Sequence, residues 1–236
     1  MKILLLSAHK YETKYFLKKF KSIPYKPHVL QIIFHNNLEI YYSSLGIGKK
    51  NISKRLDNLI DELHPDKVLL VGFAGSLRKN LNVGDVFVVN SVMFDKTMEK
   101  IESNVENGAL FPQKCLITTD FLCDKLKKYA LIEQFPDFSA VDMESFYTAM
   151  YCKQRELSII IIKSISDDLN FQIPPIEYVK KAFSNNFSKD IFKLFPSNLR
   201  DIFNIMTLFQ LRRNCKKAGK KLAKSIEKYL KFLQNC

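Results

Sequence analysis

Apolar residues occur along this chain in two patterns, short continuous runs and runs with helical spacing. Residues 2–7, 67–72 and 157–164 are continuous runs of strand length, typical of strands covered on both faces. Residues 49–63 instead predict an amphipathic helix, because apolar side chains recur there every three or four positions. That apolar stripe consists of Ile52, Leu56, Leu59 and Leu63. The pattern therefore predicts buried strands that alternate with surface helices.

The other segments extend this alternation. Further strands are expected at 29–34, 39–44, 84–92, 115–119 and 139–143, and further helices at about 11–20, 121–131 and 144–155. His35-Asn36-Asn37 indicates a hairpin, Pro24–Pro27 a connection, and residues 95–114 a long polar excursion. Strands that alternate with helices favour an α/β protein, in which helices cover both faces of one sheet.

Composition narrows the class of protein. The 236 residues are 47% hydrophobic, which suits one α/β domain with a sizeable core. No uncharged apolar run reaches about 18 residues, so no membrane span is expected, and the opening apolar stretch is too short for a secretory signal. The five cysteines lack CxxC spacing and the four histidines are scattered. We therefore expect a cytoplasmic protein with no disulfide framework, metal site or cofactor.

Positive charge is concentrated at the carboxyl-terminal end. The net charge is +13, and residues 187–236 supply +9 of it, with twelve Lys or Arg against three Asp or Glu. We therefore divide the chain into an α/β domain, residues 1–185, and a basic helical extension, residues 186–236, packed on the same domain. An apolar stripe runs through the lysines of this extension and consists of Ala218, Leu222, Ile226, Tyr229 and Leu233.

Three interpretations of this extension stay open. The stripe can pack on the body of the protein and leave a solvated basic face. Alternatively, the extension can contact an anionic membrane surface or a lipid-linked nucleoside. Binding of nucleic acid is the least favoured, because no aromatic residues are interleaved with the basic ones as a stacking platform.

Three acidic residues stand just beyond the ends of expected strands. Glu12 follows the first strand, Glu144 follows residues 139–143, and Asp167 follows residues 157–164. Functional residues gather at the carboxyl ends of strands in α/β sheets, so these three can meet in one cleft. Singly, each also has a structural explanation: a first-turn acid for Glu144, an N-cap for Asp167, and solvated helix surface for Glu12.

Short motifs in a fixed order run through about the first 170 residues. The opening Met1–Glu12 is followed by Gly46-Ile47-Gly48-Lys49, Gly72-Phe73-Ala74-Gly75, Val83-Gly84-Asp85-Val86, Val141-Asp142-Met143-Glu144 and Ser166-Asp167. Together these motifs resemble the nucleoside phosphorylase/nucleosidase superfamily and, within it, most closely the methylthioadenosine/S-adenosylhomocysteine nucleosidases. The resemblance implies a three-layer α/β/α fold with a central twisted mixed sheet, to which this chain adds basic C-terminal helices.

The resemblance also implies a role for each acid in cleaving the bond between a ribose and a purine. Asp167 protonates the purine near N7 and makes it a better leaving group, with Ser166 beside it to help raise its pKa. Glu144 binds the ribose hydroxyls and stabilises positive charge on the sugar, with Met143 packed nearby. Glu12 takes a proton from the attacking water, as in inverting glycoside hydrolysis.

Residues that complete the predicted pocket are assigned less directly. The family stacks the purine on a phenylalanine, for which Phe121 is the candidate. A one-residue gap in the alignment would give that place to Leu122 instead. His9 precedes Glu12 by three residues and is a candidate for the pocket wall.

Two departures from the family pattern fall where the attacking group belongs. Phe73 replaces a serine that helps to hold the water. Lys163 replaces an arginine and lacks the planar guanidinium group of that residue. The family's phosphorylases bind phosphate through an arginine and a hydroxyl that this chain lacks. Lys10, Lys49 and Lys163 are the residues left for a looser anion site. Hydrolysis is therefore favoured over phosphorolysis.

The substrate expected from the resemblance is a 5′-modified, adenosine-type nucleoside. Two other functions remain as alternatives: a phosphorylase, and a nucleoside-binding or membrane-associated homologue with altered catalysis. The basic extension is similar to the carboxyl-terminal part of phosphorylase-like proteins linked with hopanoid synthesis, which adds an adenosylhopane-type substrate to the candidates. A homodimer is expected by analogy alone.

Overall fold

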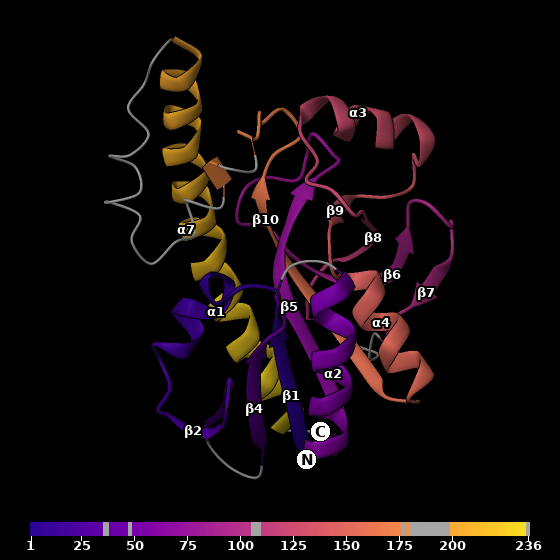
Figure 1. The fold of residues 1–236 in the computed structure, drawn as a ribbon, viewed down its shortest axis with the longest axis vertical. Helices are drawn as coiled ribbons and strands as arrows, with labels where there is room; N and C mark the ends of the chain where they lie inside the picture. Colours follow the sequence, from indigo (N-terminus) through magenta and orange to yellow (C-terminus); the bar gives the residue numbers. More distant parts are fainter. Residues whose placement is uncertain (35–37, 47–48, 105–109, 176–177, 180–198, 235–236) are drawn as a thin grey trace.

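A computed structural model describes this chain except for residues 35–37, 47–48, 105–109, 176–177, 180–198 and 235–236 (Figure 1). The strands are β1 (Lys2–Ser7), β2 (Ser22–Lys26), β3 (Val29–Ile32), β4 (Glu39–Ser44), β5 (Lys67–Ser76), β6 (Val86–Phe94), β7 (Lys100–Glu102), β8 (Gln113–Thr118), β9 (Ala140–Asp142) and β10 (Ser158–Asp167). The helices are α1 (Lys10–Leu17), α2 (Lys49–Leu63), α3 (Lys125–Gln134), α4 (Ser145–Gln154) and α7 (Leu199–Gln234).

One mixed sheet of ten strands organises the molecule, in the order β10-β6-β8-β9-β5-β1-β4-β3-β2, with β7 beside β6. Strand β10 also pairs with β5, so β5, β10, β6, β8 and β9 close into a ring. Parallel pairs such as β1–β5 and β5–β10 occur beside antiparallel pairs such as β5–β9 and β6–β10. The predicted α/β class with a mixed central sheet is confirmed, and the closed ring is a feature that the sequence pattern did not indicate.

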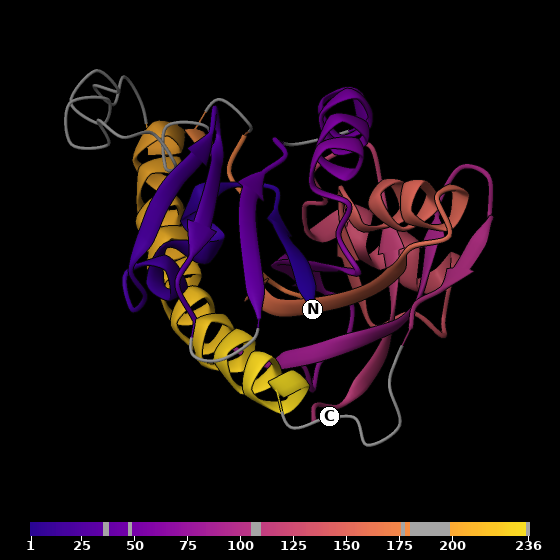
Figure 2. The ribbon, with the colours of Figure 1, turned by 90° about the horizontal axis from the view of Figure 1, so that it is seen from below.

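Helices cover both faces of the sheet because its strands are apolar on both sides. On β1, Leu4 and Leu6 pack into a cluster with α2 and α4, whereas Ile3 and Leu5 pack into a second cluster with α1 and α7. Figure 2 shows α7 running along one face and α2 and α4 lying over the other. Strand β5, at the junction of the sheet, supplies residues to both clusters.

Two segments differ from their predicted structure. Pro24–Pro27 was expected to be a connection, but Ser22–Lys26 forms β2, which pairs with β3 at the edge of the sheet. An edge strand tolerates proline, since one side of it makes no ladder hydrogen bonds. The long excursion after residue 95 contains β7. The predicted hairpin turn at residues 35–37 lies outside the described residues, although β3 and β4 do pair antiparallel.

The carboxyl-terminal helix α7 belongs to the main core. It is 36 residues long, and its predicted stripe from Ala218 to Leu233 is buried against the sheet. Gly219 allows α1 to approach α7 closely, because a Cβ there would lie 3.0 Å from Cδ2 of Tyr15. The surrounding lysines of α7 are exposed. This burial matches the first of the three interpretations of the extension, and the proposed boundary at residue 186 lies outside the described residues.

Within the described part of the chain, we find no helix that is both long enough and apolar enough to cross a membrane.

Candidate active site

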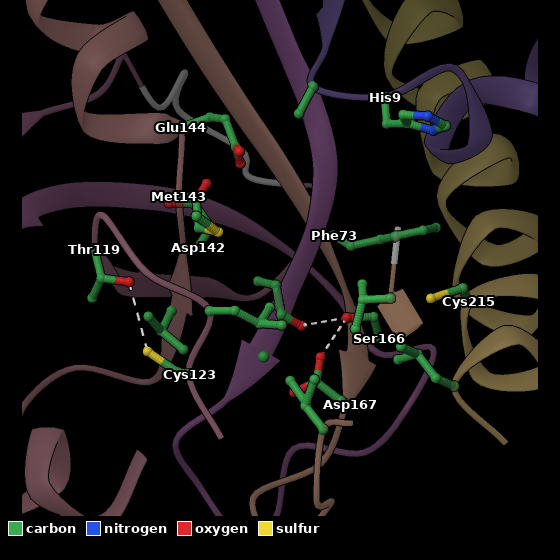
Figure 3. A pocket seen from close by; sticks show the side chains of 18 of the residues that line it. His9, Phe73, Thr119, Cys123, Asp142, Met143, Glu144, Ser166, Asp167 and Cys215 are labelled. Carbon is green, nitrogen blue, oxygen red and sulfur yellow. Dashed lines mark hydrogen bonds between the residues drawn. The ribbon is translucent and has the colours of Figure 1, made fainter. Parts of the chain in front are cut away.

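A cavity of about 550 Å³ lies where the first helix, the strand β5, the β9–α4 turn, the end of β10 and α7 meet. This volume suits a small ligand such as a nucleoside. Figure 3 shows Glu144 and Asp167 on opposite sides of the cavity, with Phe73 between them. The predicted site residues that line the cavity are His9, Glu12, Phe73, Phe121, Met143, Glu144, Ser166 and Asp167. Lys163 lies behind the wall, so it is adjacent to the cavity without lining it.

The register of β5 explains why these residues converge. Lys163 pairs with Gly72 of β5, and Asp167 pairs with Gly75, so β10 places both side chains along the same stretch of strand. On the other side of β5, Val141 of β9 also pairs with Gly75. Because β9 runs antiparallel to β5, the chain beyond β9 returns toward Gly72 and brings Glu144 with it. The acids therefore lie along the carboxyl-terminal half of one strand, from Gly72 to Gly75.

Glu12 is buried, although its place on a short helix of mostly polar residues predicts an exposed side chain. Its carboxylate closes a capping box at the start of α1, where one oxygen accepts the His9 N–H at 2.9 Å. The other oxygen accepts the Phe73 N–H at 2.8 Å. Burial raises the pKa of Glu12 above its ordinary value, while the Lys163 ammonium and these N–H donors oppose that rise.

Glu144 shares its surroundings with a buried ion pair. The Lys163 ammonium lies 2.8 Å from an Asp142 oxygen, and both side chains are almost fully buried. Burial and the nearby Asp142 charge raise the pKa of Glu144 to about 8, against the opposing effect of Lys163. Burial alone would lower the pKa of Lys163, but the carboxylates of Asp142, Glu12 and Glu144 together raise it. Three carboxyl groups thus surround one ammonium group.

Asp142 is held firmly in this cluster. It accepts hydrogen bonds from the Thr118 hydroxyl at 2.7 Å and from the Ser145 hydroxyl at 2.6 Å. It also accepts the Ser145 N–H at 3.1 Å, which fixes it at the start of α4. Beneath the cluster, a Cβ at Gly72 would lie 2.8 Å from Oε1 of Glu12 and 3.2 Å from Nζ of Lys163. Only glycine leaves room for this arrangement.

Asp167 lies at the other end of the cavity with different partners. The Ser166 hydroxyl donates to Oδ1 of Asp167 at 2.6 Å. The ammonium group of Lys128 from α3 donates to Oδ2 and forms an ion pair with it. Lys128 is fully buried and lines the cavity. The carboxyl group of Asp167 therefore has a hydrogen-bond donor on each of its oxygens.

The wall between these two ends is mostly apolar. A cluster of Phe171, Ile173, Val179, Leu211 and Cys215 packs there, and Tyr11, Phe73 and Leu122 lie against it. Phe121 and Leu122 both line the cavity, so both remain candidates for stacking on a purine base. The Lys127 ammonium lies 4.8 Å from the centre of the Phe121 ring. His9 caps α1 with its Nδ1, and burial lowers its pKa, with Lys10 adding to the effect.

Sequence reasoning missed three residues that contribute to the site. Lys128 shares the inward face of α3 with Leu131, while its polar neighbours are exposed. Its place on the same helical face as Leu131 is the one signal that could have found it. Asp142 belonged to a recognised motif, but nothing in the sequence paired it with Lys163. Cys215 reaches the cavity only because α7 packs against α1, a long-range contact that no local pattern predicts.

Comparison with known sequences identifies the family. Residues 2–131 match the family model of the Phosphorylase superfamily. The 5′-methylthioadenosine/S-adenosylhomocysteine nucleosidase of Staphylococcus epidermidis is 26% identical over 183 residues, which are 62% of this chain and 77% of that protein. The corresponding nucleosidase of Buchnera aphidicola is 28% identical over 206 residues, 76% of this chain and 78% of that one.

Solved structures share the fold. The 5′-methylthioadenosine nucleosidase of Arabidopsis thaliana superimposes with a TM-score of 0.75 at 17% identity, over 100% of this chain and 96% of that chain. The Helicobacter pylori 5′-methylthioadenosine/S-adenosylhomocysteine nucleosidase superimposes with a TM-score of 0.70 at 21% identity, over 98% of both chains.

Proposed function

Because the chain belongs to the phosphorylase superfamily, we propose that it hydrolyses the N-glycosidic bond of a 5′-modified, adenosine-type nucleoside and releases the base. The observation that carries this proposal is the arrangement of acids around one cavity. Asp167 lies at one end and Glu144 at the other, and Glu12 lies close to Glu144 and Lys163. The nucleosidase relatives support the reaction type, since their names state that they act on 5′-methylthioadenosine and S-adenosylhomocysteine.

Each acid takes the role that its surroundings favour. Asp167 transfers a proton to the purine near N7, so that the base leaves as a neutral molecule. General acid catalysis of this kind contributes about 10²–10⁴-fold to a rate. Glu144, whose pKa is raised to about 8 by burial and by Asp142, holds the ribose hydroxyls beside Met143. The ionised form of this carboxyl group stabilises the positive charge that develops on the sugar.

Glu12 acts as the base for the attacking water. Its two backbone donors fix the carboxylate in one orientation, and burial raises its pKa, which makes the carboxylate a stronger base. Removing a proton from water leaves hydroxide to attack C1′ of the ribose as the base departs, as in inverting glycoside hydrolysis.

The charge around Glu12 favours water over phosphate as the attacking group. Asp142, Glu12 and Glu144 outnumber the single ammonium of Lys163, which is already paired with Asp142. A phosphate dianion placed there would meet three carboxyl groups and an ammonium group that already has a partner. Of the other lysines considered for an anion site, Lys10 is exposed, and the side chain of Lys49 lies outside the described residues.

The apolar wall supports a substrate with an apolar group on its 5′ carbon. Ile173, Val179 and Leu211 line the cavity beside Phe73, and such a surface binds an alkylthio group more favourably than a charged one. The homodimer and a membrane-surface role for the basic extension stay predictions. Any such surface role would use the exposed lysines of α7, since its apolar stripe is buried.

Chromatographic assay of base release tests the proposal. The purified protein is incubated with 5′-methylthioadenosine, S-adenosylhomocysteine, futalosine and adenosylhopane, with and without phosphate. We expect free base and free sugar without phosphate, with the methylthio substrate cleaved best. Turnover that requires phosphate and yields a ribose 1-phosphate would replace hydrolysis by phosphorolysis. The proposal fails if no substrate is cleaved while Glu144→Gln and Asp167→Asn bind nucleosides as tightly as the unmodified protein does.

A further inference from the structure

Lys128 is a buried cation whose role the proposed chemistry has not yet used. Its Nζ donates to Oδ2 of Asp167, to the Asp168 carbonyl oxygen at 2.7 Å and to the Asp167 carbonyl oxygen at 3.5 Å. Taking an ammonium group out of water costs several kcal/mol unless it is well paired. The side chain is nevertheless fully buried and lines the cavity.

The fold makes specific room for this pair. Helix α3 exposes Leu126 and Tyr129 to solvent while it turns Lys128 inward. On strand β5, a Cβ at Gly75 would lie 2.8 Å from Oδ2 of Asp167 and 3.1 Å from Cε of Lys128. A larger residue at position 75 would therefore push the two groups apart. The contact depends on an inward lysine and a glycine from elements far apart in the sequence.

A general acid must carry a proton at the moment when the leaving purine accepts one. Asp167 alone is poorly suited to this, because each of its two oxygens already accepts a hydrogen bond, one from the Lys128 ammonium and one from the Ser166 hydroxyl. The ammonium–carboxylate pair taken together, however, holds one proton that can move between Nζ and Oδ2. We propose that Lys128 is a positioning residue that supplies Asp167 with the proton it delivers to the purine. This inference rests on the proposed function.

The step balances without any further reactant. As the C1′–N9 bond breaks, its electron pair passes into the purine ring, and N7 takes the carboxyl proton from Asp167. The Asp167 carboxyl group receives its proton from Nζ of Lys128, which becomes a neutral amine. Hydroxide from the attacking water bonds to C1′, and Glu12 holds the water's other proton. That proton returns to solvent, and solvent reprotonates Lys128.

Ser166 can remain bonded in either protonation state of Asp167. Its hydroxyl lies 2.6 Å from Oδ1 of Asp167 and has a second acceptor, the Ala74 carbonyl oxygen, at 3.4 Å. When Oδ2 carries the proton, Oδ1 still accepts the hydrogen bond from the Ser166 hydroxyl. The Ser166 contact therefore need not break as the proton moves between Nζ and Oδ2.

Neighbouring groups do not compete for this proton. Burial raises the pKa of Cys123 to about 11, and burial also raises the pKa of Cys215 on α7, so both thiols stay neutral near pH 7. Lys127 lies on the outer side of α3, and the Asp168 carboxylate accepts the Asn170 N–H. On β5, the residue facing the pair is Gly75, which carries no charge.

Two substitutions separate proton supply from mere packing. Lys128→Met keeps the length of the side chain but removes the charge, whereas Lys128→Arg keeps the charge but does not release a proton at these pH values. We expect both to lower kcat for 5′-methylthioadenosine at pH 8 by about 10²-fold. The alkaline limb of the pH–rate profile should move to lower pH in Lys128→Met.

Lys125→Met, on the same helix and outside the cavity, is the matched control and should behave like the unmodified protein. Restoration of kcat by Lys128→Arg would overturn the inference.

Calorimetry of adenine binding gives a readout that does not depend on turnover. Titrations at pH 8 in two buffers of different ionisation enthalpy count the protons taken up on binding. The unmodified protein should take up almost none, because the pair already holds one, and Lys128→Met should take up about one. Equal uptake by both proteins would refute the inference and leave the proposed function standing. A protein that binds no adenine and cleaves no nucleoside would refute the two together.

Discussion

Two buried lysines lie at the same cavity, Lys128 in its wall and Lys163 behind it, and each is paired with an aspartate, yet their surroundings differ. Lys163 pairs with Asp142 and also lies close to the carboxyl groups of Glu12 and Glu144. Lys128 pairs with Asp167 alone, and its remaining donors go to backbone carbonyl oxygens. One end of the cavity therefore has more carboxyl groups than cations, whereas the other is balanced. An excess of carboxyl groups favours accepting protons from water, and a balanced pair favours giving one to a base.

The different roles of the two ends of the cavity should be clearest with a substrate whose leaving group needs no proton. A nitrophenyl ribofuranoside is such a substrate, because nitrophenolate leaves readily as an anion. We expect Glu12→Gln to lower kcat by about 10²–10⁴-fold on this compound and on nucleosides alike. Asp167→Asn should show a loss of that size on nucleosides alone. Spectrophotometric release of nitrophenolate measures the difference, and equal losses in the two variants would abolish the comparison.

Removing the cation from the carboxyl-rich end should destabilise the whole protein. Lys163→Met leaves Asp142 buried without its partner, and breaking a buried pair in this way costs about 3–5 kcal/mol. Urea unfolding followed by circular dichroism measures the change in the free energy of unfolding. The double variant Lys163→Met with Asp142→Asn should recover part of that loss. A double variant no more stable than the single one would mean that pairing is not what Lys163 provides.

The same end should make stability depend on pH. The pKa of Glu144 rises from 4.5 to about 8 on folding because of burial and Asp142, so the folded state binds its proton more tightly than the unfolded state does. The resulting stabilisation is fully present below pH 4.5 and is lost as pH rises toward 8, at up to about 1.4 kcal/mol per pH unit. Glu12 acts in the same direction. Melting temperatures between pH 5 and 8 should fall more steeply for the unmodified protein than for Glu144→Gln, and parallel slopes would contradict this account.

The two glycines of β5 offer a smaller and more local test. A methyl group at Gly72 would lie against Glu12, and one at Gly75 would lie against Asp167 and Lys128. Each substitution to alanine should lower kcat on nucleosides by up to about 10²-fold, the size expected when a reacting group is displaced by roughly 1 Å. On the nitrophenyl substrate, Gly75→Ala should lose less activity than Gly72→Ala does. The two variants serve as controls for each other, and identical behaviour would show that the ends are not independent.

Much of this architecture follows from local patterns, and the rest depends on long-range pairing. The apolar runs at residues 2–7, 67–72 and 157–164 correspond to β1, β5 and β10, because a strand buried on both faces leaves a recognisable sequence. The edge strand β2 escaped notice, since Pro24 is a turn signal wherever it occurs. The closed ring of strands was equally hidden, because pairing of β5 with both β9 and β10 leaves no mark on any single segment.

The candidate site shows the same limit. The motifs around Glu144 and Asp167 directed attention to residues that line one cavity. Burial of Glu12 was not predictable from a polar helix, because its carboxylate packs against Gly72 and Phe73 of β5, which are far away in the sequence. Lys128 was missed for a related reason: a lysine between other lysines looks like solvated surface until the orientation of its helix is known.

The position of α7 after the strands that it covers has a consequence for synthesis. Leu211 and Cys215 of this helix line the cavity, and its later residues cover the face of the sheet formed by Ile3 and Leu5. During translation, the strands leave the ribosome long before the helix that covers them. The nascent protein therefore exposes an apolar sheet face, and its cavity lacks a wall, until α7 has been made. Activity should appear only once α7 has left the ribosome, and premature termination near residue 200 should yield an aggregating product.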